Sequence, residues 1–384
     1  MRQHINILRE FSAPLISGVI IALFWANFSP ETYALFNHSP LIGSLSFHFL
    51  TNDIFMTLFF GIAAVEITQS CMPGGDLHPL RKAVTPLMAT CGGVIGPVVI
   101  YLSLNAVMGS PALYRGWGIP TATDIALAWL TARIVFGDRH SAIPFLLLLA
   151  IADDGIGLAI IAIFYPDPLH PVEPLWALLT AIGMSAAYFM RRFGVRNYWP
   201  YLLIGGTLSW AGLFMSHLHP ALALVFIIPF LPSLPNEKMR LFEEDPEDYS
   251  TISNFERDWK IIVDFGLFMF GLANAGVRFS SIGEITWIVL ASLVIGKTCG
   301  IFCMAWLCRQ FGYSLPGNMK NRELVLVGLI GGIGMTVALF VAGEAFVDPV
   351  TQGAAKMGAL FSASCAVIAI VLGKLLNIER RRSS

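Results

Sequence analysis

The chain has 384 residues, of which 56% are hydrophobic and only 13% are charged. Soluble globular domains average about 25% charged residues, so this composition excludes an ordinary soluble enzyme. The formal net charge of −1 gives no sign of a nucleic-acid partner, and none is predicted.

Apolar segments long enough to cross a bilayer recur along the whole chain. A hydrocarbon core of roughly 30 Å requires about 20 apolar residues in a helix, whereas barrel strands would alternate apolar and polar residues over about 10 positions. The sequence therefore predicts an all-α polytopic membrane protein with twelve spans. Their approximate bounds are Ala13–Phe28, Ile54–Gln69, Val84–Met108, Gly118–Val135, Ile143–Tyr165, Leu175–Met190, Tyr201–Met215, Ala221–Leu231, Ile261–Val277, Ile285–Leu307, Leu324–Phe346 and Ala354–Leu376.

The basic residues indicate how these spans are oriented. The termini and the even-numbered loops contain twenty of the 24 Lys and Arg residues, whereas the odd-numbered loops contain Arg115, Arg278 and, near a helix entrance, Lys356. Because Lys and Arg accumulate in cytoplasmic loops, we expect both termini in the cytoplasm and the chain in the cell inner membrane. One domain is predicted over residues 1–384, with residues 233–260 as a solvated cytoplasmic linker.

The second and fourth predicted spans contain the first buried acidic residues, Glu66 and Asp124. An ionised side chain at a helix centre destabilises insertion into the membrane by roughly 2.5 to 3.5 kcal/mol. Each such residue is therefore expected to have a functional or structural role that offsets this cost. Before Asp124, Gly116, Gly118 and Pro120 predict a broken helix, which is typical of transporter ion sites. Freed carbonyls, the Asp124 carboxylate and the Thr123 hydroxyl would supply the oxygen ligands that hard cations prefer.

The fifth span contains two consecutive carboxylates, Asp153 and Asp154. Adjacent helical residues point about 100° apart, so one side chain can line a cavity while the other contacts a neighbouring helix. The small residues around them leave room for an ion or water. The alternative interpretation is a buried ion pair that only holds helices together.

Lys297 lies about midway through the tenth span, and a lysine at this depth is expected to pair with a carboxylate. Breaking such a pair can drive proton uptake or release, although a permanent structural bridge is the alternative. The eleventh span carries a second glycine cluster before Thr336, which predicts a second helix break related to the first by an inverted repeat. Close helix packing would also explain these glycines, which are Gly328, Gly331, Gly332 and Gly334.

A cation and protons that compete for the same carboxylates would be exchanged if the site opened alternately to either side of the membrane. The pattern therefore favours an antiporter without a cofactor. A sodium-coupled solute symporter is the main alternative, and a channel is a further one. An intramembrane aspartyl protease would need facing aspartates such as Asp124 and Asp153, but the G-x-G-D sequence of that class is absent.

Five stretches of the chain carry a resemblance to a known family. They are ATDIALA at Ala122–Ala128, AIADDGIG at Ala150–Gly157, ANAGV at Ala273–Val277, IGKTCGI at Ile295–Ile301 and GGIGMTVALF at Gly331–Phe340. In order and spacing they resemble the NhaA family of bacterial sodium/proton antiporters, itself a known example of an inverted-repeat transporter. The similarity runs from the first predicted span to the last.

The resemblance implies a role for each residue of the predicted site. Asp154 is similar to the main cation carboxylate, Asp153 to the neighbouring carboxylate that pairs with Lys297, and Asp124 with Thr123 to the contribution of the crossing helices. Asp153 and Asp154 would thus bind Na+ or Li+ in exchange for H+. The resemblance also implies twelve helices with crossed, broken spans four and eleven, a cytoplasmic funnel, electrogenic exchange, and a homodimer in membrane lipid.

The chain departs from the family pattern at two places. The segment Phe36–Phe49, where the family often has a dimerising β-hairpin, is short, and Glu66 is followed by Ile-Thr-Gln-Ser instead of a basic cluster implicated in pH activation. We therefore expect a pH dependence that arises largely from competition at Asp154. Glu66, Glu256 and His219 are the candidates for pH sensing or for lining the funnel.

Overall fold

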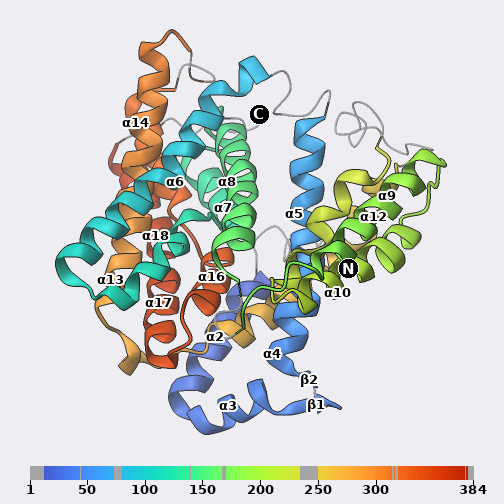
Figure 1. Cartoon of the computed structure of the whole chain (residues 1–384). Coiled ribbons are helices and arrows are strands. Elements are labelled where there is room, and N and C mark those ends of the chain that lie inside the picture. The colour runs from blue at the N-terminus through green and yellow to red at the C-terminus, as the bar shows by residue number, and fades with distance from the viewer. Residues whose placement is uncertain are drawn as a thin grey trace, which may run out of the picture. The chain divides into compact units, whose positions relative to one another are not determined.

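The computed structural model describes residues 13–43, 45–72, 80–137, 140–166, 170–233, 250–313, 315, 319–376 and 378 (Figure 1). The described chain is predominantly helical, as predicted. It divides into two compact units, each formed by segments that are distant in sequence. The first unit comprises Met1–Ala34, Ala83–Gly157 and Gly271–Ser384, and the second comprises Leu35–Lys82 and Leu158–Phe270.

The first unit contains all of the predicted ion-site residues. Its elements are α2 (Ala13–Phe28), the start of α3 (Pro30–His38), most of α6 (Leu80–Met108), η2 (Pro111–Thr121), α7 (Ile125–Phe136), the first part of α8 (Ala142–Phe164), the end of α12 (Thr251–Asn274), η6 (Phe279–Ser281), α13 (Glu284–Ala291), η7 (Ser292–Gly296), α14 (Lys297–Gln310), α15 (Asn321–Gly331), α16 (Val337–Ala345), α17 (Pro349–Phe361) and α18 (Ser364–Leu375).

Helices stop inside two of the predicted spans of this unit. The 3-10 helix η2 and α7 are separated by residues 122–124 and meet at an angle of 57°. Pro120 near the end of η2 has no backbone N–H, and Asp124 then caps α7 by accepting from Leu127 N at 3.0 Å. Helices α15 and α16 are separated by the non-helical residues 332–336. Both interruptions lie where the glycines and the proline predicted them.

Glycines bring α6 very close to the helix that carries Lys297. A Cβ atom at Gly92 would lie 2.1 Å from Gly300 O, and one at Gly300 would lie 2.0 Å from Gly92 O. One turn away, a Cβ at Gly96 would lie 2.2 Å from Gly296 O. Real Cβ atoms do not approach a carbonyl this closely, so only glycine permits the contact. Because Lys297 lies between Gly296 and Gly300, this packing fixes the face from which its side chain projects.

The second unit combines a small hairpin with the remaining helices. Its elements are the end of α3, β1 (Pro40–Ile42), β2 (Leu45–Ser46), α4 (Phe47–Phe49), η1 (Leu50–Phe55), α5 (Met56–Cys71), the end of α8, α9 (Ala177–Arg192), η3 (Tyr201–Gly206), α10 (Thr207–Met215), η4 (Pro220–Phe226), η5 (Ile228–Phe230) and most of α12. Tyr201, Ile227 and Phe255 are fully buried in its core.

The hairpin corrects the expectation of a purely α-helical chain. Strands β1 and β2 pair antiparallel, with Pro40 opposite Ser46 and Ile42 opposite Leu45. The segment Phe36–Phe49 is long enough to form a hairpin because its turn is tight. Gly43 in this turn adopts a φ of +62°, a left-handed conformation that glycine permits. The eighth predicted span differs too, since it consists of the short 3-10 segments η4 and η5, and each begins at or beside a proline.

Among the described residues, five helices are long and apolar enough to cross a membrane, or six if η2 and α7 form one bent span. The count of twelve spans stays a prediction. Helix α12 begins at Thr251, ten residues before the predicted ninth span. Residues 234–249 of the predicted linker, with the acidic run from Glu243 to Asp248, lie outside the described residues. The single domain over residues 1–384 also stays a prediction.

The glycine contact between α6 and α14 generates a stability prediction. Gly92→Ala should lower the melting temperature in detergent, because overpacking a close contact destabilises by about 1 to 3 kcal/mol. Gly157→Ala on α8 is the matched control, since its Cβ would have an ordinary contact of 3.9 Å with Ala122. Equal melting temperatures for the two variants would contradict the close approach of α6 and α14.

Candidate functional site

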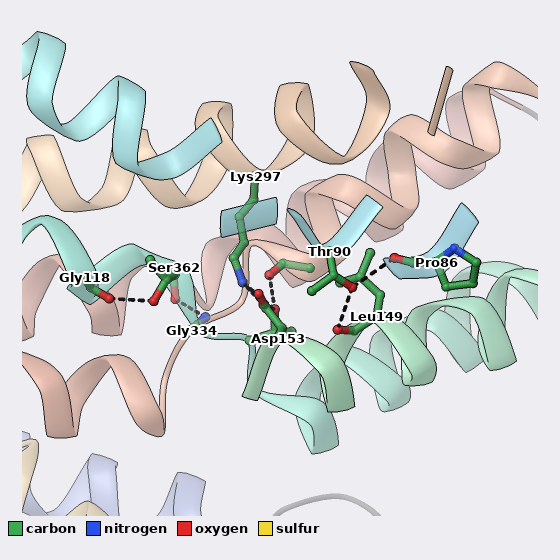
Figure 2. A network of polar contacts seen from close by, with 11 residues as sticks. Pro86, Thr90, Gly118, Leu149, Asp153, Lys297, Gly334 and Ser362 are labelled. Carbon is green, nitrogen blue, oxygen red and sulfur yellow. Dashed lines mark hydrogen bonds and ion pairs between the residues drawn. The ribbon is translucent and has the colours of Figure 1, made fainter. Parts of the chain in front are cut away.

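A fully buried ion pair lies at the centre of the first unit. Lys297 at the start of α14 donates to Asp153 Oδ2 on α8, and both side chains are 0% exposed (Figure 2). Lys297 Nζ also lies 2.6 Å from Thr123 Oγ1, in the break between η2 and α7. Three segments that are distant in sequence therefore meet at one ammonium group.

The Thr123 hydroxyl connects this ion pair to the second helix break. Its Oγ1 lies 2.7 Å from Asp153 Oδ2 and 2.9 Å from Gly331 O, at the end of α15. A hydroxyl has a single proton to donate, so it can serve only one of these two acceptors at a time. Its acceptor therefore depends on whether the carboxylate of Asp153 is charged or occupied by a proton or cation.

Asp124 joins the two breaks through its backbone. Its N–H donates to Ile333 O at 2.6 Å, while its side chain caps α7. Asp153 Oδ1 is buried and has no hydrogen-bond partner among the described residues. A buried carboxylate oxygen requires a donor or a cation, so this atom fits the requirement of a site for a cation or a proton.

Asp154 follows Asp153 on α8 and is only 7% exposed. The helical period turns it about 100° away from its neighbour, and it still interacts electrostatically with Lys297. Asp153 thus contacts the buried ammonium directly, and Asp154 lies within range of its charge. On the preceding turn of α8, Leu149 O lies 3.4 Å from Thr90 Oγ1 of α6, and this hydroxyl is also 3.0 Å from Pro86 O (Figure 2).

The second unit contains a separate charged cluster. Lys260 Nζ on α12 lies 3.3 Å from Glu256 Oε1 and 3.6 Å from Glu66 Oε1 of α5. Gln69 Nε2 donates to Glu256 Oε2 at 3.2 Å. The structure thus brings Glu66 and Glu256 together. Lys260 and Gln69 were missed from the sequence, although the four-residue spacing of Glu256 and Lys260 on one helix was a usable signal.

The structure does not bring His219 to this cluster. His219 lies in the turn before η4, and the next residue, Pro220, accepts from Thr57 Oγ1 at 3.4 Å near the start of α5. Glu66 is nine residues further along the same helix, which corresponds to roughly 13 Å. His219 therefore lies near the other end of α5, apart from Glu66 and Glu256, and its part in pH sensing stays a prediction.

Lys356 is a second lysine whose burial the sequence did not reveal. It was expected near a helix entrance, but α17 begins at Pro349, and Lys356 is 7% exposed in the third turn. Its Nζ lies 3.5 Å from Asn274 Oδ1 at the end of α12, and it interacts electrostatically with Glu344 of α16. Lys297 is therefore not the only deeply buried lysine of the first unit.

Comparison with known proteins gives consistent matches over nearly the whole chain. The profile of the family described as Na+/H+ antiporter 1 matches residues 5–376. The Na(+)/H(+) antiporter NhaA 1 of Pelobacter propionicus is 68% identical, over 99% of this chain and 100% of that protein. The Na(+)/H(+) antiporter NhaA of Geobacter sulfurreducens is 65% identical with the same coverage. A more distant NhaA, from Jannaschia, is 40% identical over 98% of each chain. By both the family profile and these relatives, this chain belongs to the Na+/H+ antiporter 1 family.

Proposed function

We propose that this chain exchanges sodium or lithium ions for protons across the cell inner membrane. The observation that carries the proposal is the buried group of Asp153, Lys297 and Thr123 at the point where two interrupted helices meet. Carboxylate, hydroxyl and carbonyl oxygens are the ligands of hard cations. The names of the relatives, which are Na(+)/H(+) antiporters, support the same function.

The chemistry of exchange follows from competition for the carboxylates. In the proposed cycle, Asp154 is the main cation ligand, and Asp153 with Thr123 supplies further oxygens. A cation at Asp153 would weaken its attraction to Lys297, because the carboxylate charge is then shared. Protons that reach the carboxylates from the opposite side displace the cation, so one site never holds both. Net charge moves when more than one proton is exchanged for each cation.

Alternating access requires the same site to open to either face of the membrane. We propose twelve spans with cytoplasmic termini, in which the interrupted spans four and eleven cross as the related halves of an inverted repeat. The hydrogen bond from Asp124 N to Ile333 O joins the two interruptions and supports this arrangement. Asp124 would then balance the partial charges of the half-helix ends. The β1–β2 hairpin is a candidate contact for a homodimer.

The first functional prediction concerns the two adjacent aspartates. Asp154→Asn and Asp153→Asn should each abolish exchange, because an amide keeps the shape of the carboxylate but releases no proton. The measurement is proton release in proteoliposomes with an imposed proton gradient, after addition of Na+, Li+ or K+ alone. Asp348→Asn is the matched control, since Asp348 caps α17 at the surface and asparagine caps equally well.

Two outcomes of this assay would count against the proposal. Near-normal sodium-dependent release by Asp154→Asn would remove that residue as the shared site. If sodium alone leaves the imposed proton gradient intact and the wild-type protein instead takes up an organic solute together with sodium, the chain is a sodium-coupled symporter.

Lys297→Ala should destabilise the folded protein. It leaves the carboxylate of Asp153 buried without its ammonium, a change worth about 3 to 5 kcal/mol for a fully buried pair. The readout is thermal melting in detergent, compared with the double variant Lys297→Met/Asp153→Leu, which removes both charges. The double variant should melt at a higher temperature than Lys297→Ala. An unchanged melting temperature for Lys297→Ala would show that the pair does not stabilise the fold.

The pH profile should reflect competition between protons and sodium. Acidification lowers the rate because protons then occupy the carboxylates, so raising the sodium concentration should restore much of the lost rate. The measurement is the initial exchange rate against pH at several sodium concentrations, without a standing gradient. A steep loss that saturating sodium cannot relieve would instead point to a separate sensor. The cluster of Glu66, Glu256 and Lys260 would then be the next target.

A further inference from the structure

Ser362 lies at the junction between α17 and α18 and is 0% exposed. Its hydroxyl donates to Ala359 O at 2.6 Å and accepts from Gly334 N at 2.9 Å. The single hydroxyl proton and one lone pair are therefore both used. The first bond is local to α17, but the second reaches the break between α15 and α16 (Figure 2).

The N–H of Gly334 and the C=O of Ile333 belong to one peptide unit. That C=O accepts from Asp124 N at 2.6 Å, while the N–H donates to Ser362. A peptide unit is planar and rigid, and in the trans form its C=O and N–H point in opposite directions. The Ile333–Gly334 peptide unit thus connects Asp124 on one side to Ser362 on the other. Rotation of this peptide unit would disturb both hydrogen bonds together.

The surrounding residues leave this peptide little room to find another position. A Cβ atom at Gly334 would lie 3.1 Å from Leu293 Cδ2 and 3.2 Å from Ala122 O. Ala122 immediately precedes Thr123, which contacts Asp153 and Lys297. A change in the orientation of the peptide is therefore transmitted directly to the segment that completes the candidate site.

We propose that Ser362 is a positioning residue for cation exchange, acting through the Ile333–Gly334 peptide on Asp124 and Thr123. This inference rests on the proposed function. Both hydrogen bonds of the Ser362 hydroxyl go to backbone groups, those of Ala359 and Gly334. The hydroxyl holds the peptide in the orientation that keeps the two interruptions together. Without the hydroxyl, the buried Gly334 N–H lacks its partner, and the peptide is no longer held in one orientation.

The test is sodium-dependent proton release by Ser362→Ala in proteoliposomes, measured as KM for sodium, maximal rate and pH profile. Loss of one buried hydrogen bond should raise KM roughly tenfold, with a maximal rate close to that of the wild type. Weaker sodium binding lets protons compete at higher pH, so the acidic limb of the profile should move to higher pH. Ser362→Cys keeps a weak acceptor of similar size and should be intermediate.

Ser216→Ala is the matched control. Ser216 is also 0% exposed and donates to a carbonyl of its own helix, Gly212 O at 2.6 Å, but it belongs to the second unit. The proposal is overturned if Ser362→Ala keeps the KM and pH profile of Ser216→Ala, even when its melting temperature is lower. Should Ser362→Ala fail to insert, a wild-type KM for Ser362→Cys overturns it equally. Absence of sodium-dependent release from the wild-type protein would instead refute the proposed function.

Discussion

The structure depends on one constraint: backbone polar groups freed inside a membrane must find partners within the protein. A continuous helix satisfies this requirement by itself, but each interruption exposes N–H and C=O groups at its ends. Here polar groups of each interruption find hydrogen-bond partners in the other, since Asp124 N donates to Ile333 O and Thr123 Oγ1 contacts Gly331 O. The geometry of the candidate site is therefore a consequence of how the broken backbones are satisfied.

The charged groups follow from the same arrangement. Lys297 lies on α14, which approaches α6 closely only because Gly92 and Gly300 lack side chains, and its ammonium group contacts Asp153 of α8. A buried ammonium with two neighbouring carboxylates leaves room for one more positive charge, and either a proton or a small cation can supply it. The close glycine contact, the two helix interruptions and the buried charges thus all contribute to the geometry of the same candidate site.

Much of the site could be predicted from the sequence, because charges and helix-breaking residues are conspicuous in an apolar chain. Asp153, Asp154 and Lys297 stood out by their energetic penalty, and Pro120 indicated the first interruption by its missing N–H. Burial of Lys356 could not be predicted, since it depends on where α17 begins. Ser362 was missed for a different reason: one serine in an apolar stretch forms no pattern, and its role arises from a partner 28 residues away in sequence.

The contact between α6 and α14 has a consequence for how such a chain can vary over evolutionary time. In most cores, a larger residue on one helix can be accommodated by a smaller one on the facing helix. At Gly92 and Gly300 both partners are already the smallest residue, and each faces the backbone oxygen of the other. No second substitution can make room for the first. Neither Gly92 nor Gly300 can therefore be replaced while the two helices keep this contact. A chain that retains both glycines also retains the orientation of the helix that carries Lys297.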